Sequence, residues 1–399
     1  MTAADYPALI LKRGEDRRLR AGHLWVFSNE VDVARSPLTA MEAGSPVHVL
    51  DAGGKPVGTG YVNPSTLICA RLLDRGGHAL DRSLLVHRLN VALALRERLF
   101  DTPHYRLVYG ESDGLPGLVI DRFGDVVVAQ LGTVGMERMK DAIVDAVRKV
   151  LNPAALLFRN DGGARAIEGL PSYVEVAFGE VPERVIVDEG GLKFAVDVQH
   201  GQKTGWFFDQ QDNRDRLRKL VPGLRVLDVF SYVGAWGIRA AGFGASEVTC
   251  VDASGPACEQ IRDNARRNGF GDTVEAVCAD AFEYLKQARA ERRKWDVVIL
   301  DPPAFVKRRK DFKEGALAYR RINEMAMQVL ERDGLLVSAS CSYHMGRDAL
   351  LEAIQAGARH LDRQVQVLCQ LQQSADHPVH AAIVETDYLK GYVCRVLPA

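Results

Sequence analysis

The chain has 399 residues, a hydrophobic content of 47%, a charged content of 26% and a formal net charge of −1. This composition is typical of a globular protein, and no apolar run approaches the roughly 20 residues that a transmembrane helix needs. At about 100 to 200 residues per domain, the length predicts two to three domains. The first residues, Met1-Thr2-Ala3-Ala4-Asp5-Tyr6-Pro7, lack the basic and apolar regions of a secretory signal, so we expect a cytoplasmic protein.

Residues 1–75 consist of short β-like runs separated by turn signals, which predicts a small β-barrel. These runs are Leu9 to Leu11, Val47 to Leu50, Val57 to Val62 and Leu67 to Leu73.

Residues 76–183 are expected to form a second, α+β unit. Leucines at near-helical spacing predict a helix from Asp81 to Phe100, with Asp81 as its cap. The further predicted elements are strands at Arg106 to Tyr109, Leu118 to Asp121, Val126 to Leu131 and Ala155 to Phe158, with a helix from about Met136 to Leu151.

The last region, 184–399, opens with a hairpin signal, because Asp188-Glu189-Gly190-Gly191 separates two short apolar runs. Strands and helices then alternate, which predicts an α/β fold with a mostly parallel sheet covered on both faces. The predicted strands are Arg225 to Val229, Glu247 to Val251, Thr273 to Cys278, Trp295 to Leu300 and Leu335 to Ser340, and the predicted helices lie near 235–242, 255–268, 281–292, 314–331 and 346–360.

Two of these strand ends carry an acid and a thiol. The strand at Trp295 to Leu300 runs into Asp301-Pro302-Pro303, and the next runs into Ser340-Cys341-Ser342. Since ligands of open α/β sheets bind at the carboxyl ends of strands, we expect Asp301 and Cys341 on one rim. A lone cysteine after an apolar strand is more often an inert core residue, but polar neighbours surround Cys341.

Acids also lie at or near the ends of the three preceding strands, at Asp228, Asp252 and Asp280. A single such acid is more often a helix cap, whereas the series favours a nucleoside without phosphates, such as S-adenosylmethionine. The pattern Gly-x-Gly-x-x-Gly is absent, which argues against NAD. The segment 201–210, with Lys203, Thr204, Phe207 and Asp209, is either a loop over a ligand or an aromatic staple.

With a methyl donor on this rim, the thiol suggests covalent attack on a pyrimidine. In this hypothesis the Cys341 thiolate adds to C6 of cytosine, C5 takes the methyl group, and a base that the sequence does not identify removes the C5 proton. Asp301, on a stiff turn, could hold the N4 and N3 edge of an extruded cytosine, and Phe305 could stack on it. Lys307 or Arg308 could lower the pKa of the thiol.

Seven cysteines without Cys-x-x-Cys spacing predict reduced thiols, neither a disulfide framework nor a metal site. Two basic clusters, Lys12 to Arg20 and Lys307 to Lys313, are by themselves more typical of a solvated face than of an RNA contact. The second cluster directly follows the proposed chemistry, so the two interpretations of it are about equal.

Longer motifs resemble the bacterial large-subunit ribosomal RNA methyltransferase I family over the whole chain. They are Gly110-Glu111-Ser112-Asp113-Gly114-Leu115-Pro116-Gly117-Leu118, Gln202-Lys203-Thr204-Gly205 with Asp209-Gln210 and Asn213-Arg214, Asp228-Val229-Phe230-Ser231-Tyr232, Asp301-Pro302-Pro303-Ala304-Phe305, Ser340-Cys341-Ser342, Asp376-His377-Pro378 and Tyr388-Leu389-Lys390-Gly391.

The resemblance implies a PUA domain over 1–75, a central α+β domain over 76–183 and a Rossmann-like, S-adenosylmethionine-dependent methyltransferase domain over 184–399. It implies 23S ribosomal RNA or a large-subunit precursor as partner, 5-methylcytosine as product, cytosine 1962 as target and Cys341 as nucleophile. The candidate cofactor-binding residues are Lys203, Thr204, Phe207, Asp209, Asp228, Phe230, Tyr232, Gly234, Asp252, Asp280, Phe282 and Asp301, and the candidate RNA-binding residues are Phe305, Lys307, Arg308, Arg309, Lys12, Arg13 and Arg17.

Several alternatives stay open from the sequence. One is methylation of a guanine or adenine nitrogen, with Asp301 accepting the amine and Cys341 structural. In amino-group methyltransferases, however, an aromatic residue usually follows the second proline, where this chain has Ala304. Another is a noncatalytic RNA-binding assembly factor, and a small-molecule methyltransferase is the least favoured. A homodimer is possible.

Overall fold

The computed structural model describes residues 6–399, and the signal prediction above rests partly on residues outside this range. The chain divides into two compact units. The first unit comprises Met1–Val185, Asp197–Phe208 and Asp376–Thr386, and the second comprises Ile186–Val196, Asp209–Ala375 and Asp387–Ala399. Each unit is therefore built from segments that are far apart in the sequence.

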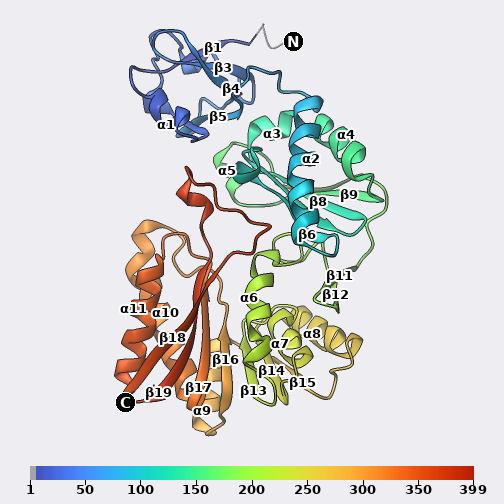
Figure 1. The fold of residues 1–399 in the computed structure, drawn as a ribbon, viewed down its shortest axis with the longest axis vertical. Helices are drawn as coiled ribbons and strands as arrows, with labels where there is room; N and C mark the ends of the chain where they lie inside the picture. Colours follow the sequence, from blue (N-terminus) through green and yellow to red (C-terminus); the bar gives the residue numbers. More distant parts are fainter. Residues whose placement is uncertain (1–5) are drawn as a thin grey trace. The chain divides into compact units, whose positions relative to one another are not determined.

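The first unit begins with a five-stranded sheet in the order β1-β3-β4-β5-β2 (Figure 1). Its elements are β1 (Ala8–Ile10), α1 (Asp16–Arg20), β2 (Trp25–Phe27), β3 (Pro46–Leu50), β4 (Pro56–Val62) and β5 (Ile68–Asp74). Strand β1 pairs with β3 in parallel, and the other pairs are antiparallel. Four of these strands agree with the predicted runs, whereas the three-residue β2 was not predicted.

A second five-stranded sheet follows in the first unit, in the order β10-β9-β8-β7-β6. Its elements are α2 (Arg82–Leu99), β6 (His104–Tyr109), β7 (Leu118–Phe123), β8 (Val126–Leu131), α3 (Val134–Arg138), α4 (Lys140–Leu151), β9 (Ala155–Asn160), α5 (Ala164–Ile167) and β10 (Tyr173–Phe178). Asp81 caps α2 as predicted, because its side chain accepts from the backbone nitrogens of Ser83 and Leu84. Strand β10 is an addition to the predicted elements.

The second unit contains a hairpin and a seven-stranded sheet. The hairpin is β11 (Val185–Glu189) and β12 (Leu192–Val196), and Gly190 and Gly191 in its turn have φ of 60° and 81°. The sheet has the order β15-β14-β13-β16-β17-β19-β18. Its elements and the helices between them are α6 (Gln211–Asp215), β13 (Arg225–Val229), α7 (Ala235–Gly242), β14 (Glu247–Asp252), α8 (Gly255–Arg267), β15 (Val274–Cys278), α9 (Ala281–Ala290), β16 (Trp295–Leu300), α10 (Phe312–Val329), β17 (Leu330–Ser340), α11 (Arg347–His360), β18 (Arg363–Gln372) and β19 (Lys390–Pro398).

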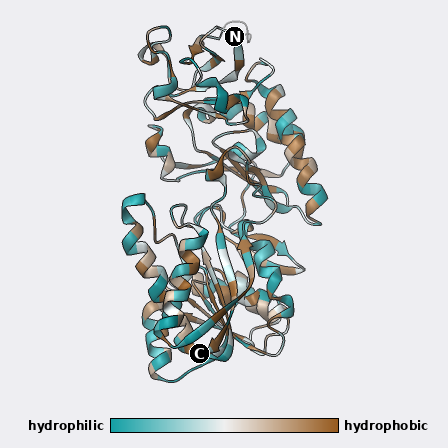
Figure 2. Ribbon diagram, turned by 60° about the vertical axis from the view of Figure 1, so that its left-hand side comes forward, coloured by the Kyte–Doolittle hydropathy of each residue, from teal (hydrophilic) through white to brown (hydrophobic). Residues whose placement is uncertain are grey.

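Strands β13 to β17 pair in parallel, as the strand and helix alternation predicts. The prediction omitted β18 and β19, and β19 is inserted antiparallel between β17 and β18. Helices α9, α10 and α11 share one hydrophobic core with this sheet, including Trp295, Tyr319 and Ile354. The helices carry both teal and brown turns in Figure 2, as amphipathic helices against a sheet do.

Short 3-10 turns complete the described chain, at Ser28–Glu30, Leu38–Ala40, Gly110–Asp113, Phe208–Gln210, Arg216–Lys219, Arg309–Asp311 and Val384–Thr386. None of the helices within residues 6–399 combines the length and the apolar composition that crossing a membrane requires. None of the seven cysteines, all of which lie within residues 6–399, forms a disulfide bond.

Candidate active site

The site lies at the carboxyl ends of β13 and β16 in the second unit. Strand β13 has β14 on one side and β16 on the other, so the direction of strand order reverses between β13 and β16. In open α/β sheets, the crevice outside the strand ends at such a switch point is where ligands bind. Asp228 lies near the end of β13 and Asp301 directly follows β16; both are predicted site residues.

The loop after β13 has an unusual backbone. Phe230, Tyr232 and Gly234 have φ of 67°, 51° and 84°, values that L side chains seldom adopt. A Cβ on Gly234 would lie 2.9 Å from Cδ1 of Ile238, so only glycine fits there without rearrangement. Strained backbone of this kind is concentrated at ligand-binding sites.

Acids hold this loop from within the sheet. The Asp228 carboxylate accepts from the backbone nitrogen of Gly237 at 3.0 Å, and the Ser231 hydroxyl donates to the Asp228 carbonyl at 2.7 Å. One oxygen of Asp252 accepts from the Tyr232 nitrogen at 2.9 Å, and the other from the Ser254 nitrogen at 2.9 Å. The loop conformation is thus fixed by side chains of two neighbouring strands.

Asp228 has no exposed surface. The pKa of its carboxyl is raised to about 7, mainly by burial; the hydrogen bonds from Gly237 and Ser231 lower it, and the nearby charges of Asp301 and Asp252 raise it. The Asp228 carboxyl is thus fully enclosed, whereas Asp252 is only partly buried and Asp280 is exposed. Asp280 caps α9, accepting from the nitrogens of Phe282 and Glu283, so it also has the structural role that single acids usually have.

Aromatic side chains accompany these acids. The rings of Phe230 and Phe282 lie 6.4 and 6.3 Å from that of Phe305, and Phe305 packs on Tyr319 at 4.9 Å. All three phenylalanines are partly exposed. Partly exposed rings together with the carboxylates of Asp252 and Asp280 suit a nucleoside, since aromatic faces pack on a base and carboxylates accept from hydroxyl and amine groups.

Asp301 is positioned by two side chains that the sequence did not indicate. Its Oδ2 accepts from Nε2 of Gln210 at 3.0 Å and from Nε1 of Trp236 at 3.1 Å. Gln210 and Trp236 are both buried, whereas Asp301 is partly exposed. Two donors and a following Pro302-Pro303 fix the direction of the carboxylate.

Cys341 lies beside this acid-proline turn, as expected from strand order. Strand β17 pairs with β16, and Sγ of Cys341 lies 4.0 Å from the carbonyl oxygen of Pro302. The side chain is partly exposed, in contrast to the buried Cys69, Cys250 and Cys394. It is therefore not enclosed in the hydrocarbon core, the environment in which a cysteine is inert.

The predicted cofactor residues of segment 201–210 have local partners. In the first unit, the buried Thr204 donates its hydroxyl to Asp121, and the Lys203 ammonium lies 4.3 Å from the centre of the Phe207 ring. In the second unit, the buried Asp209 accepts from the Tyr388 hydroxyl. A role for these residues in cofactor binding stays a prediction.

The predicted RNA-binding cations are all exposed, namely Lys12, Arg13 and Arg17 in the first unit and Lys307, Arg308 and Arg309 in the second. Two of them also have protein partners: Lys12 donates to the Asn29 carbonyl at 2.8 Å, and Arg308 pairs with Asp311 at 2.9 Å. These surface contacts leave the charges accessible to a polyanion.

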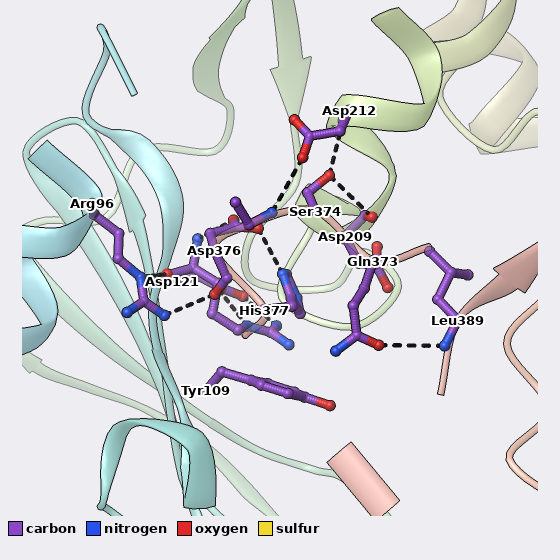
Figure 3. Close-up of polar contacts among 12 residues, drawn as sticks. Arg96, Tyr109, Asp121, Asp209, Asp212, Gln373, Ser374, Asp376, His377 and Leu389 are labelled. Carbon is purple, nitrogen blue, oxygen red and sulfur yellow. Dashed lines mark hydrogen bonds and ion pairs between the residues drawn. The ribbon is translucent and has the colours of Figure 1, made fainter. Parts of the chain in front are cut away.

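The segment before β19 forms buried polar contacts whose roles the sequence motifs did not reveal (Figure 3). In the first unit, the Asp376 carboxylate accepts from the backbone nitrogen of Arg106 and bonds to Nδ1 of His377, each at 2.8 Å, and its carbonyl accepts from Arg96 at 2.8 Å. Burial by itself raises the pKa of Asp376, but His377 and Arg106 hold it below its ordinary value.

Figure 3 also shows a cluster in the second unit around Ser374, whose hydroxyl donates to the Asp209 carbonyl at 3.2 Å and accepts from the Asp212 nitrogen at 2.8 Å. Since Ser374 is more than 160 residues from Asp209 and Asp212 in the sequence, only their joint position in the fold reveals this cluster.

Comparison with protein families agrees with this geometry. Residues 9–75 match a model described as a PUA-like domain, and residues 170–380 match a model described as an S-adenosylmethionine-dependent methyltransferase. Among curated proteins, the chain is 37% identical over 404 residues to ribosomal RNA large subunit methyltransferase I of Klebsiella pneumoniae strain 342, covering 100% of both chains. It is 37% identical to the protein of that name from Shewanella denitrificans, covering 97% of this chain and 98% of the relative.

Solved structures show the same fold. A candidate SAM-dependent methyltransferase from Streptococcus mutans superposes with a TM-score of 0.82 at 21% identity, covering 98% of this chain and 100% of that chain. A second candidate methyltransferase, solved in complex with SAH, gives 0.83 at 22% identity with the same coverage. The protein uses S-adenosylmethionine, and the chain belongs to the ribosomal RNA large subunit methyltransferase I family.

Proposed function

We propose that the protein methylates C5 of a cytosine in 23S ribosomal RNA, with Cys341 as the covalent nucleophile and cytosine 1962 as the target. The observation that carries this proposal is the partly exposed Cys341 thiol, 4.0 Å from the Pro302 carbonyl in the turn that follows Asp301. Methylation of an amine needs no thiol at this place, whereas C5 of cytosine becomes nucleophilic only after addition at C6.

When bound, S-adenosylmethionine supplies an electrophilic methyl group on a sulfonium. In the proposed reaction, Sγ of Cys341 forms a bond to C6, and the electrons of the C5=C6 bond take the methyl group at C5. Loss of the C5 proton to a base then restores the double bond and expels the thiolate. The residues that we propose for the cofactor in the second unit are the loop from Phe230 to Gly234, Asp209, Asp252, Asp280 and Phe282. Lys203, Thr204 and Phe207 of the first unit stay predictions from the sequence.

Asp301 and Phe305 serve the base in this proposal. Gln210 and Trp236 fix the Asp301 carboxylate, so it can accept a hydrogen bond from the cytosine N4 amine without reorganising. The same acid could accept the amine of a guanine or adenine. Asp301 therefore does not discriminate between the two chemistries, and the thiol does.

For RNA, we propose that the PUA-like domain and the exposed cations Lys12, Arg13, Arg17, Lys307, Arg308 and Arg309 contact phosphates. Curated relatives named ribosomal RNA large subunit methyltransferase I support a large-subunit RNA partner. Such a partner places the protein in the cytoplasm.

The test is bisulfite mapping of ribosomal RNA from a strain that lacks the gene, complemented with wild type or Cys341→Ala. We expect one cytosine to lose its mark without the gene, to regain it with wild type and to stay unmarked with Cys341→Ala. The variant should still bind S-adenosylmethionine in a calorimetric titration. Full methylation by Cys341→Ala would refute the covalent mechanism. A methylated purine that is present in digested RNA with the gene and missing without it would refute the choice of base.

A further inference from the structure

Lys390 is a buried cation next to the thiol of Cys341. It begins β19 and lies opposite Ser340 in the antiparallel pair of β17 and β19. Its Nζ donates to the carbonyl of Ser342 at 2.8 Å. Since Ser340 and Ser342 flank Cys341 in the chain, Lys390 contacts the backbone on both sides of the thiol, and only 6% of its surface is exposed.

Hydroxyl groups fix the chain on either side of Cys341. The Ser340 hydroxyl donates to the Tyr319 hydroxyl at 2.8 Å, and Tyr319 and the Ser342 hydroxyl are 2.9 Å apart. Ser342 Oγ also accepts from the backbone nitrogen of Val306 at 3.1 Å. These buried hydrogen bonds, together with the one from Lys390 to Ser342, hold the backbone around Cys341 in place. The position of the Lys390 ammonium relative to the thiol therefore depends on buried contacts and not on a flexible surface contact.

Two further charged groups interact with Lys390: Asp387, which precedes β19, and Arg347 of α11. The pKa of Lys390 is lowered overall, mainly by burial; Asp387 raises it, Arg347 of α11 lowers it, and Cys341 raises it. Cys341 in turn interacts electrostatically with Tyr319 of α10. The interaction with Cys341 favours the pair of ammonium and thiolate, because each charge stabilises the other.

We propose that Lys390 keeps Cys341 as a thiolate before the substrate arrives. The thiol proton leaves to water, and the sulfur electron pair is then ready to form a bond. Lys390 acts through Cys341, so it is a positioning residue and does not touch the base. This role replaces the one that the sequence suggested for Lys307 or Arg308, which are exposed. That the thiolate then attacks C6 rests on the proposed function.

The test is the pH profile of Cys341 alkylation by iodoacetamide, followed by peptide mass spectrometry on the full chain without RNA or cofactor. Lys390→Met retains the apolar stem and removes the charge. We expect its alkylation midpoint to rise by one pH unit or more, which slows alkylation about tenfold at pH values well below the wild-type midpoint. Lys390→Arg should stay near the wild-type profile.

Lys294 offers a matched control. It is a partly buried lysine whose Nζ also donates to a backbone carbonyl, that of Gln328 at 2.7 Å, but it precedes β16 and so lies at the opposite strand end. Lys294→Met should leave the Cys341 profile unchanged, and the exposed Cys278 in the same digests reports on the reagent.

An equal midpoint in wild type and Lys390→Met would overturn the inference. If Lys390→Met melts below the assay temperature, the wild-type titration decides. A Cys341 midpoint below the ordinary thiol value of about 8.5 supports the inference, and a midpoint at or above that value refutes it. The assay involves no methyl transfer. A shifted midpoint with an active Cys341→Ala enzyme therefore refutes only the proposed function, and an unshifted midpoint with an inactive one refutes only the role of Lys390.

Discussion

Replacing Asp228 by asparagine is expected to remove a pH-dependent loss of stability. Burial raises the pKa of this carboxyl from an ordinary 3.8 to about 7 in the folded protein. Between these values the folded state holds a proton that the unfolded state has lost, so stability must fall as the pH rises through the folded pKa. Asparagine has nearly the same volume and keeps an oxygen that can accept from the Gly237 nitrogen.

The magnitude follows from the two pKa values. Between pH 5 and pH 8 the linkage relation gives a loss of about 2.5 kcal/mol for wild type, and no such loss for Asp228→Asn. Urea denaturation of both proteins at several pH values in this range, followed by tryptophan fluorescence, measures the free energy of unfolding at each pH. The difference in unfolding free energy between variant and wild type should grow by about 2.5 kcal/mol toward pH 8.

Because only the difference between two proteins is used, the pH dependence of all other groups cancels. The exposed Asp272→Asn is the control for the loss of one negative charge, and its curve should run parallel to that of wild type. Parallel curves for Asp228→Asn as well would refute the reasoning, since they would mean that Asp228 is ionised in the folded protein at no cost.

Three further changes test other parts of the molecule. Gly234→Ala should destabilise the second unit by about 1–3 kcal/mol in urea melts and weaken S-adenosylmethionine binding, because φ is 84° and the added Cβ meets Ile238. Asp376→Ala should cost about 3–5 kcal/mol, since it leaves buried partners of the carboxylate uncompensated, and an unchanged melting curve would contradict this. The triple variant of Lys12, Arg13 and Arg17 to Ala should reduce the slope of log affinity against log salt for a 23S RNA fragment by about 2 to 3, and an equal slope would exclude phosphate contacts.

The sequence by itself determined the parallel half of the large sheet. The predicted bounds of β13 and β16 equal the observed Arg225–Val229 and Trp295–Leu300, because both are short runs of mostly apolar residues, rich in valine, that are largely buried in the sheet. It also located Asp301 and Cys341 at neighbouring strand ends, since consecutive strands of such a sheet often pair. These inferences needed only local pattern.

Tertiary structure alone decided the rest of the site. Strand β18 is largely exposed and carries no buried apolar run, and β19 follows a long irregular segment before it inserts antiparallel, so pairing rather than local pattern defines both. The donors to Asp301 and the cation beside Cys341 come from segments distant in the chain. Their roles arise from a few hydrogen bonds across the fold, and a linear pattern of residue types does not encode such distances.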